Sequence, residues 1–291
     1  MQQYLSGATF IALYGISYGV VLFTISIGLV LMLGLMRVVN LAHLAFAAFG
    51  GYLALSLTNN YAMPLALSIP IAVIMVAAFS VILERICYVR LYRASELDQV
   101  LMTIGLMFLA VASLNLLFGP NVLPGQLPPE LAASLDIAGH RMQVYRLFVV
   151  AVGAALLLAL WIIFDRTGFG ARLRAAVDNS TMAQAIGIDV SRLFSVAFAL
   201  GTGLAALGGA VGYAILPLEP LYPFKYLALV LVVVVLTGVG NIKASAGVAV
   251  FVGVMDTACR FIFPAFGAFF IYVLLIGLVL WRDRGLFAGA R

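Results

Sequence analysis

The run TFIALYGISYGVVLFTISIGLVLML, from Thr9 to Leu33, decides the class of fold. It contains no Asp, Glu, Lys or Arg, and it exceeds the roughly 20 mostly apolar residues that an α-helix needs to cross a hydrocarbon core about 30 Å thick. The whole chain has the same character, because 65% of its 291 residues are hydrophobic and only 9% are charged. Average soluble domains carry roughly 25% charged residues. The composition therefore predicts a protein embedded in a lipid bilayer.

Further apolar runs follow, each bounded by charged residues, Pro or Gly. They are Leu41–Leu57, Pro64–Leu83, Val100–Phe118, Tyr145–Phe164, Leu193–Leu216, Tyr226–Leu236, Ala244–Phe261 and Phe266–Trp281. The sequence predicts an all-α fold, a polytopic transmembrane helical bundle of about eight or nine spans in which some spans are broken or are half-spans. We expect a single transmembrane domain over residues 1–291.

The basic residues are distributed unevenly between the two sides of a nine-pass chain. Most of the 16 Lys and Arg residues fall on one side: Arg37, Arg85, Arg90, Arg93, Arg166, Arg172, Arg174, Arg192, Lys243, Arg282, Arg284 and Arg291. Arg141, Arg146 and Lys225 fall on the other side. Because cytoplasmic loops of membrane proteins collect Lys and Arg, this pattern predicts an N-terminus outside and a C-terminus in the cytoplasm. It also explains the basic excess without any binding of nucleic acid.

The longest polar interruption is DRTGFGARLRAAVDNSTMAQAIGIDVSR, from Asp165 to Arg192. Asp178 to Thr181 supply a signal for the start of a helix, and Met182 to Ile188 read as a short amphipathic helix with Gly187 at the position of a C-cap. The residues alone allow two interpretations, a solvated cytoplasmic linker or a docking helix for a soluble partner.

Two segments interrupted by Gly or Asn form a weak internal repeat. The first contains Asn40 and His43 and leads into Phe46–Gly51; the second contains Asn241 and leads into Ser245–Gly253. Broken segments in corresponding halves of a membrane protein point to a transport pathway, because irregular backbone is tolerated at depth only beside a cavity or protein. The alternative is a pair of ordinary cytoplasmic turns followed by closely packed glycines.

The residue inventory disfavours most enzymes. His43 and His140 have no other ligand at a metal-binding spacing, and no GxSxG motif occurs. Neither of the two lysines, Lys225 and Lys243, follows the glycine spacing of a phosphate-binding loop. We therefore expect no catalytic activity and no metal or cofactor in this chain, so that any ATP-driven work belongs to another polypeptide.

One charged pair is predicted inside an apolar helix. Asp256 and Arg260 are four residues apart, so they share a face and can pair. An ionisable residue within the bilayer is a candidate functional group, although a neutralised pair that fixes helix packing explains the pattern equally well. A proton- or sodium-coupled carrier usually needs more buried carboxylates than this chain offers.

Six segments, in order, resemble the permease subunits of ATP-binding-cassette importers for branched-chain amino acids, the LivH type. They are MRVVNLAHLAFAAFGGYLAL (Met36–Leu55), ERICYVRLYRA (Glu84–Ala94), TIGLMFL with LLFGP (Thr103–Leu109 and Leu116–Pro120), the segment from Arg166 to Arg192, LTGVGNIKASAGVAVFVGVMD (Leu236–Asp256) and RDRGLF (Arg282–Phe287). Three positions depart from the family pattern, namely Leu44 for Gly, Asn241–Ala244 for G-S-x-x-G, and Asp283 for Pro. These departures bear on the substrate more than on transport itself.

The resemblance implies roles for two sets of residues. The stretch 165–192 would be the cytoplasmic coupling loop that seats on an ATPase subunit, with Arg172, Arg174, Asp178, Ala183, Ala185, Gly187 and Ile188 at the contact. Small residues would allow close approach, and the arginines would meet acidic groups. The candidates for lining the substrate pathway are Asn40, His43, Thr103, Thr237 and Asn241.

The resemblance also implies a transporter complex of several subunits. It would comprise this chain, a second permease that is homologous or identical, two cytoplasmic subunits that bind ATP, and an extracytoplasmic solute-binding protein, in the lipid of a bacterial plasma (inner) membrane. The expected function is import of leucine, isoleucine or valine. Two alternatives stay open: the same machinery importing urea, short amides or other amino acids, and a carrier or channel that works without an ATPase.

Overall fold

The computed structural model describes residues 2–36, 38–92, 94–123, 125, 127, 129–137, 140–238 and 241–265, together with 267, 269, 272–273 and 276–277. Most of the predicted last span, Phe266–Trp281, lies outside the described residues. So do Arg37, Arg93, Asp283 and the tail arginines Arg282, Arg284 and Arg291.

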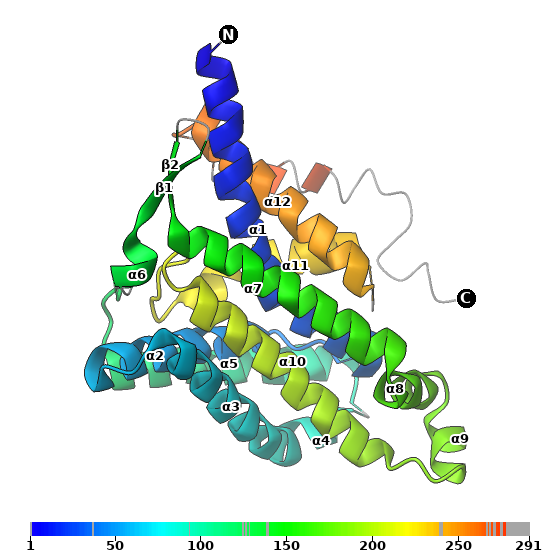
Figure 1. Ribbon diagram of the computed structural model, residues 1–291. Coiled ribbons are helices and arrows are strands. Elements are labelled where there is room, and N and C mark those ends of the chain that lie inside the picture. The colour runs from blue at the N-terminus through cyan, green and yellow to red at the C-terminus, as the bar shows by residue number, and fades with distance from the viewer. Residues whose placement is uncertain are drawn as a thin grey trace.

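The described chain is built almost entirely from helices (Figure 1). The longer ones are α1 (Gln2–Met36), α2 (His43–Tyr61), α3 (Leu65–Leu83), α5 (Glu96–Phe118), α7 (Val144–Trp161), α10 (Val190–Gly212), α11 (Tyr222–Thr237) and α12 (Ile242–Ile262). The shorter ones are α4 (Val89–Leu91), α6 (Pro129–Ala132), α8 (Gly168–Asp178) and α9 (Ser180–Ala185), with π-helical turns at Glu84–Tyr88 and Ile162–Arg166.

Six helices in the described part of the chain are long and apolar enough to cross a membrane. They are Gly7–Gly34, Leu65–Leu91, Glu96–Phe118, Val144–Arg166, Val190–Gly212 and Ile242–Ile262. Two other predicted runs correspond to α2 and to the shorter apolar helix α11. This confirms the prediction of a polytopic transmembrane helical bundle.

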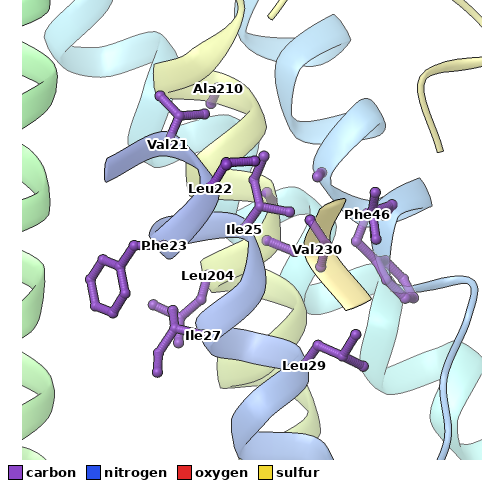
Figure 2. Close-up of a cluster of buried hydrophobic side chains, with 14 of the residues drawn as sticks. Val21, Leu22, Phe23, Ile25, Ile27, Leu29, Phe46, Leu204, Ala210 and Val230 are labelled. Atoms are coloured by element: carbon purple, nitrogen blue, oxygen red, sulfur yellow. The ribbon is translucent and has the colours of Figure 1, made fainter. Parts of the chain in front are cut away.

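Helix α1 is the centre of the bundle. It packs against α10, α12, α7 and α11, and its residues from Val20 to Met32 are almost all buried. Figure 2 shows Val21, Leu22, Ile25 and Ile27 of α1 lying among side chains of α2, α10 and α11. A helix covered on all sides must be apolar on all sides, which explains why the run that decides the fold carries no charge.

Glycines allow the helix backbones around α1 to approach closely. A Cβ added to Gly15 would lie 2.6 Å from the Cα of Val254, and one added to Gly208 would lie 2.5 Å from Cγ1 of Ile25. A Cβ at Gly253 would overlap the backbone of Gly19. Because lipid tails are as apolar as the helices, association in a bilayer depends on close contact between small residues.

The Pro-rich segment Gly119–Gln143 between α5 and α7 contains secondary structure of its own. It contains α6 and a hairpin of β1 (Ser134–Ile137) and β2 (His140–Gln143), in which Ser134 pairs with Gln143. The hydroxyl of Tyr14 on α1 donates to the carbonyl of Arg141 over 3.1 Å. The hairpin therefore lies beside the N-terminal half of α1, at the end of the bundle far from α8 and α9 (Figure 1).

Replacing Gly253 with Val should lower the midpoint of thermal unfolding in detergent, because the new side chain would push α12 away from Gly19 on α1. Overpacking of this kind costs about 1–3 kcal/mol. Gly247→Val on the same helix is the matched control, since a Cβ there meets no described atom within 4 Å. Equal midpoints for the two variants would contradict close packing between α1 and α12.

Candidate functional site

The short helix predicted over Met182–Ile188 is present as α9, with the bounds Ser180–Ala185. The side chain of Asn179 caps its first turn by accepting a hydrogen bond from the backbone of Met182 over 2.9 Å. Gly187 ends it with φ of 88°, in the left-handed region that favours glycine. The start and stop signals of the sequence therefore act where they were predicted.

The polar sequence before α9 is also helical, which the sequence analysis did not predict. It forms α8, which is joined to α7 by the π-helical turn Ile162–Arg166. Nη1 of Arg174 donates to the carbonyl of Phe164 over 2.6 Å, and Nε of Arg172 donates to the carbonyl of Gly168 over 3.1 Å. Both arginines are exposed and also help to cap the backbone at this corner.

The expected contact residues of α9 do not all face outward. Ala183 is only 2% exposed and packs with Ala176 and Val190. This residue therefore contributes to the packing of α9 against α8 and against the start of α10. Ala185, Gly187 and Asp178 are exposed, and Ile188 is half-buried against the same cluster. Two large apolar side chains that were not among the predicted contact residues, Met182 and Ile186, are 63% and 69% exposed.

Basic residues from several loops meet at the end of the bundle that carries α9. Nη1 of Arg85, after α3, donates to Oγ of Ser191 at the start of α10 over 3.4 Å. Nζ of Lys243, at the start of α12, lies 3.6 Å from Oδ2 of Asp165. The loops that the sequence analysis grouped on one side therefore lie together in space.

The first broken segment, between α1 and α2, is held by side chains of α5. Oε1 of Gln99 accepts a hydrogen bond from the backbone of Val39 over 3.0 Å, and Oγ1 of Thr103 accepts one from Leu41 over 3.3 Å. Backbone that leaves the helical pattern where it is buried needs such partners, because an unpaired buried N–H or C=O group is costly. Hydrogen bonds to two side chains of α5 thus stabilise the non-helical backbone of the break.

Asn40 lies inside this break and is completely buried. Its Oδ1 accepts a hydrogen bond from the hydroxyl of Tyr88 over 2.8 Å. Its Nδ2 has no hydrogen-bond partner among the described residues. A buried amide nitrogen is costly to leave unpaired, so Asn40 keeps donor capacity for a further group.

His43 follows as the first residue of α2. Its Nε2 lies 3.1 Å from the carbonyl oxygen of Ile25. A carbonyl can only accept, so Nε2 carries the proton and Nδ1 is left as an acceptor. Nδ1 has no partner within the part of the chain that the structure describes. The break therefore presents both a donor and an acceptor that have no partner among the described residues.

The second broken segment is built differently. Oγ1 of Thr237 donates to the carbonyl of Val233 in its own helix over 2.6 Å. Asn241 is exposed and caps α12 by accepting from the backbone of Ala244 over 3.0 Å. The structure thus brings Asn40 and Thr103 into one cluster next to His43. In contrast, Thr237 and Asn241 form hydrogen bonds with the backbone of their own helices.

The predicted pair Asp256–Arg260 is present. Nε of Arg260 donates to Oδ2 of Asp256 over 3.0 Å, and the carboxylate is 2% exposed. Among the described residues, no three His, Cys, Asp or Glu side chains are placed to hold a metal ion.

Comparison with known proteins decides the family. Residues 11–279 match the family described as branched-chain amino acid transport system / permease component. The chain belongs to this family. No solved structure matches it.

Relatives of this permease are similar over most of their length. The high-affinity branched-chain amino acid transport system permease protein BraD of Pseudomonas aeruginosa is 22% identical over 302 residues, which cover 98% of this chain and 95% of the relative. A protein of Methanocaldococcus jannaschii named "Probable branched-chain amino acid transport permease protein LivH" is 24% identical over 275 residues, or 91% and 86% of the two chains. LivH of Salmonella typhimurium is 22% identical over 271 residues, or 88% and 84%.

Replacing Thr103 with Val should destabilise the permease, because the isosteric side chain leaves the buried backbone of the break without an acceptor. Such a loss costs about 1–3 kcal/mol and should lower the midpoint of thermal unfolding in detergent. Thr257→Val is the matched control, since among the described residues the Thr257 hydroxyl bonds only to Gly253 of its own helix, over 2.8 Å. A Thr103→Val midpoint as high as that of the control would show that α5 does not hold the break.

Proposed function

We propose that this permease is the membrane subunit of an ATP-binding-cassette importer and forms the pathway for branched-chain amino acids. The observation that carries the proposal is family membership over residues 11–279. The cluster at the first break supports it, because Asn40 and His43 offer an unused donor and an unused acceptor. Groups of both kinds can meet the carboxylate and the ammonium of an amino acid.

The proposed complex contains a second permease, homologous or identical, two cytoplasmic ATPase subunits and an extracytoplasmic solute-binding protein. This chain lacks the sequence of a phosphate-binding loop. We assign ATP binding and hydrolysis to the ATPase subunits, and no catalytic step or cofactor to this chain.

We assign the basic end of the bundle to the cytoplasm, following the rule that cytoplasmic loops are rich in Lys and Arg. Arg85, Arg172 and Lys243 then lie inside, and the hairpin β1–β2 and the N-terminus lie outside. This orientation in a bacterial plasma (inner) membrane makes α9 available to an ATPase subunit.

In this arrangement α9 is the coupling helix. Its side chains Met182 and Ile186 are exposed, and the preceding helix α8 exposes Arg172 and Arg174. Its inner face is fastened to α8 and α10 through Ala183. A helix held in this way transmits rigid-body motion of a partner to the spans on either side.

A second candidate function uses the same transporter complex but has urea, a short amide or another amino acid as the substrate. The observation in its favour is the set of departures from the family pattern. One of them, Leu44, is completely buried directly after His43, so the change from the family's Gly adds an apolar side chain beside the proposed pathway.

Reconstitution of the full complex in liposomes separates these functions. We expect uptake of labelled leucine that requires ATP inside the liposomes and the binding protein outside. Labelled urea in the same assay tests the second candidate, and urea uptake without leucine uptake would overturn the leucine assignment. Full gradient-driven uptake by the permease alone would favour a carrier or channel that needs no ATPase.

Replacing Ile186 with Asp should weaken or abolish copurification of the ATPase subunits and should lower ATP-dependent uptake about tenfold or more, because a charge would be buried in an apolar contact. Gln184→Glu adds the same charge to a polar, exposed position of α9 and is the matched control. If Ile186→Asp copurifies with the ATPase as well as the control does, α9 is not the docking helix.

A further inference from the structure

A buried carboxylate lies between the proposed coupling helix and the broken segment. Glu84 is the first residue of the π-helical turn Glu84–Tyr88 at the end of α3, and its exposed fraction is only 1%. π-Helical turns are rare and often mark functional positions. Neither the pathway nor the docking surface described above uses Glu84.

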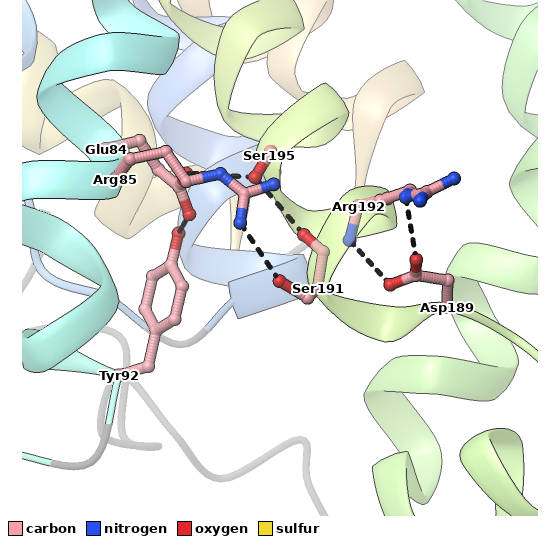
Figure 3. A network of polar contacts seen from close by, with 7 residues as sticks. All are labelled: Glu84, Arg85, Tyr92, Asp189, Ser191, Arg192 and Ser195. Atoms are coloured by element: carbon pink, nitrogen blue, oxygen red, sulfur yellow. Dashed lines mark hydrogen bonds and ion pairs between the residues drawn. The ribbon is translucent and has the colours of Figure 1, made fainter.

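The carboxylate of Glu84 joins α3 to α10 (Figure 3). Its Oε2 accepts a hydrogen bond from Oγ of Ser195 over 2.9 Å and lies 3.7 Å from Nε of Arg85. Its Oε1 accepts from the hydroxyl of Tyr92 over 2.5 Å. Burial and the neighbouring carboxylate raise the pKa of the Tyr92 phenol, so Tyr92 stays protonated as the donor.

A buried carboxylate is costly unless its hydrogen bonds are complete. One of the partners of Glu84, Ser195, belongs to α10, so Glu84 is fully paired only while α10 is seated against α3. The single hydroxyl proton of Ser195 has a second acceptor, the carbonyl of Ser191 in its own helix, at 3.2 Å. The hydroxyl of Ser195 can therefore donate either to Glu84 or to the carbonyl of Ser191.

The start of α10 is tied to the coupling helix. The side chain of Asp189, which follows α9 closely, caps α10 by accepting from the backbone of Arg192 over 3.0 Å. Ser191 accepts from Arg85 (Figure 3), and Val190 packs with Ala183 of α9. A displacement of α9 must therefore move the turn of α10 that faces Glu84.

The other end of the π-helical turn reaches the broken segment. The ring of Tyr88 is completely buried and lies 4.7 Å, centroid to centroid, from the ring of Phe198 on α10. Its hydroxyl donates to Asn40 over 2.8 Å. The π-helical turn thus contacts α10 through Glu84 and the candidate pathway residue Asn40 through Tyr88.

We propose that Glu84 is a positioning residue for transport. Movement of the coupling helix α9 shifts Ser195, which is bonded to Glu84. The π-helical turn passes this shift to Tyr88, which repositions Asn40. This inference rests on the proposed function. It adds a specific route between the ATPase contact and the pathway, carried by one buried carboxylate.

The test uses the complete complex in liposomes and measures amino-acid molecules imported per ATP hydrolysed. Glu84→Gln keeps the shape of the side chain but replaces one acceptor oxygen with a donor. We expect the complex to assemble and hydrolyse ATP while import per ATP falls about tenfold or more, which corresponds to the loss of a hydrogen bond to a charged group.

The matched control is Asp98→Asn, the same exchange of carboxylate for amide at an exposed residue that also accepts from a hydroxyl, Oγ of Ser95, over 2.7 Å. Ser195→Ala should lower import per ATP in the same direction, and Glu84→Gln combined with Ser195→Ala should be no worse than Glu84→Gln alone. Ser195→Thr keeps the hydroxyl and should restore coupling.

An assembled Glu84→Gln complex with wild-type import per ATP would overturn the proposal. So would equal losses of ATP hydrolysis and import, because a merely structural role leaves their ratio unchanged. If Glu84→Gln does not fold, Tyr88→Phe decides, since it removes only the hydroxyl that contacts Asn40. A wild-type ratio in Tyr88→Phe excludes the route, and a wild-type complex without ATP-driven uptake overturns the proposed function instead.

Discussion

A buried peptide group without a hydrogen-bond partner costs about 1–3 kcal/mol, and this constraint governs the segment between α1 and α2. The chain leaves the helical pattern between α1 and α2 and remains buried there. It can do so because Gln99 and Thr103 of α5 supply acceptors to the backbone of Val39 and Leu41. α5 also packs against α2, where the rings of Phe118 and Tyr52 lie 4.6 Å apart, centroid to centroid, so Gln99 and Thr103 add polar contacts to an apolar one.

Glycines determine how closely the apolar helices pack around α1. Close approach at Gly253 and Gly208 lets α12 and α10 contact the backbone of α1, and side chains of α2, α10 and α11 fill the remaining space around it (Figure 2). At the end of the bundle that carries α9, polar contacts link the π-helical turn to the start of α10, and Ala183 of α9 packs against Val190. Polar contacts with alternative partners can exchange, whereas a packed core changes state only as a unit.

Polar groups are divided between the two breaks in a way that the weak repeat does not reveal. The sequence treats Asn40 and Asn241 as equivalent, because each follows a polar interruption and precedes a helix rich in small residues. In space, Asn241 is a surface cap, whereas Asn40 is buried and has unused donor capacity. The difference comes from α5, which covers the first break.

The sequence by itself determined the features that depend on composition or on neighbours along the chain. These are the apolar helices, the capping of α9 by Asn179 and Gly187, and the pairing of Asp256 with Arg260 four residues away. Tertiary structure alone decided which distant groups meet. Glu84 with Ser195, Tyr88 with Asn40 and the inward face of Ala183 depend on how separate helices pack. No local pattern encodes such contacts, because periodicity shows which face of a helix is apolar but not which helix will cover it.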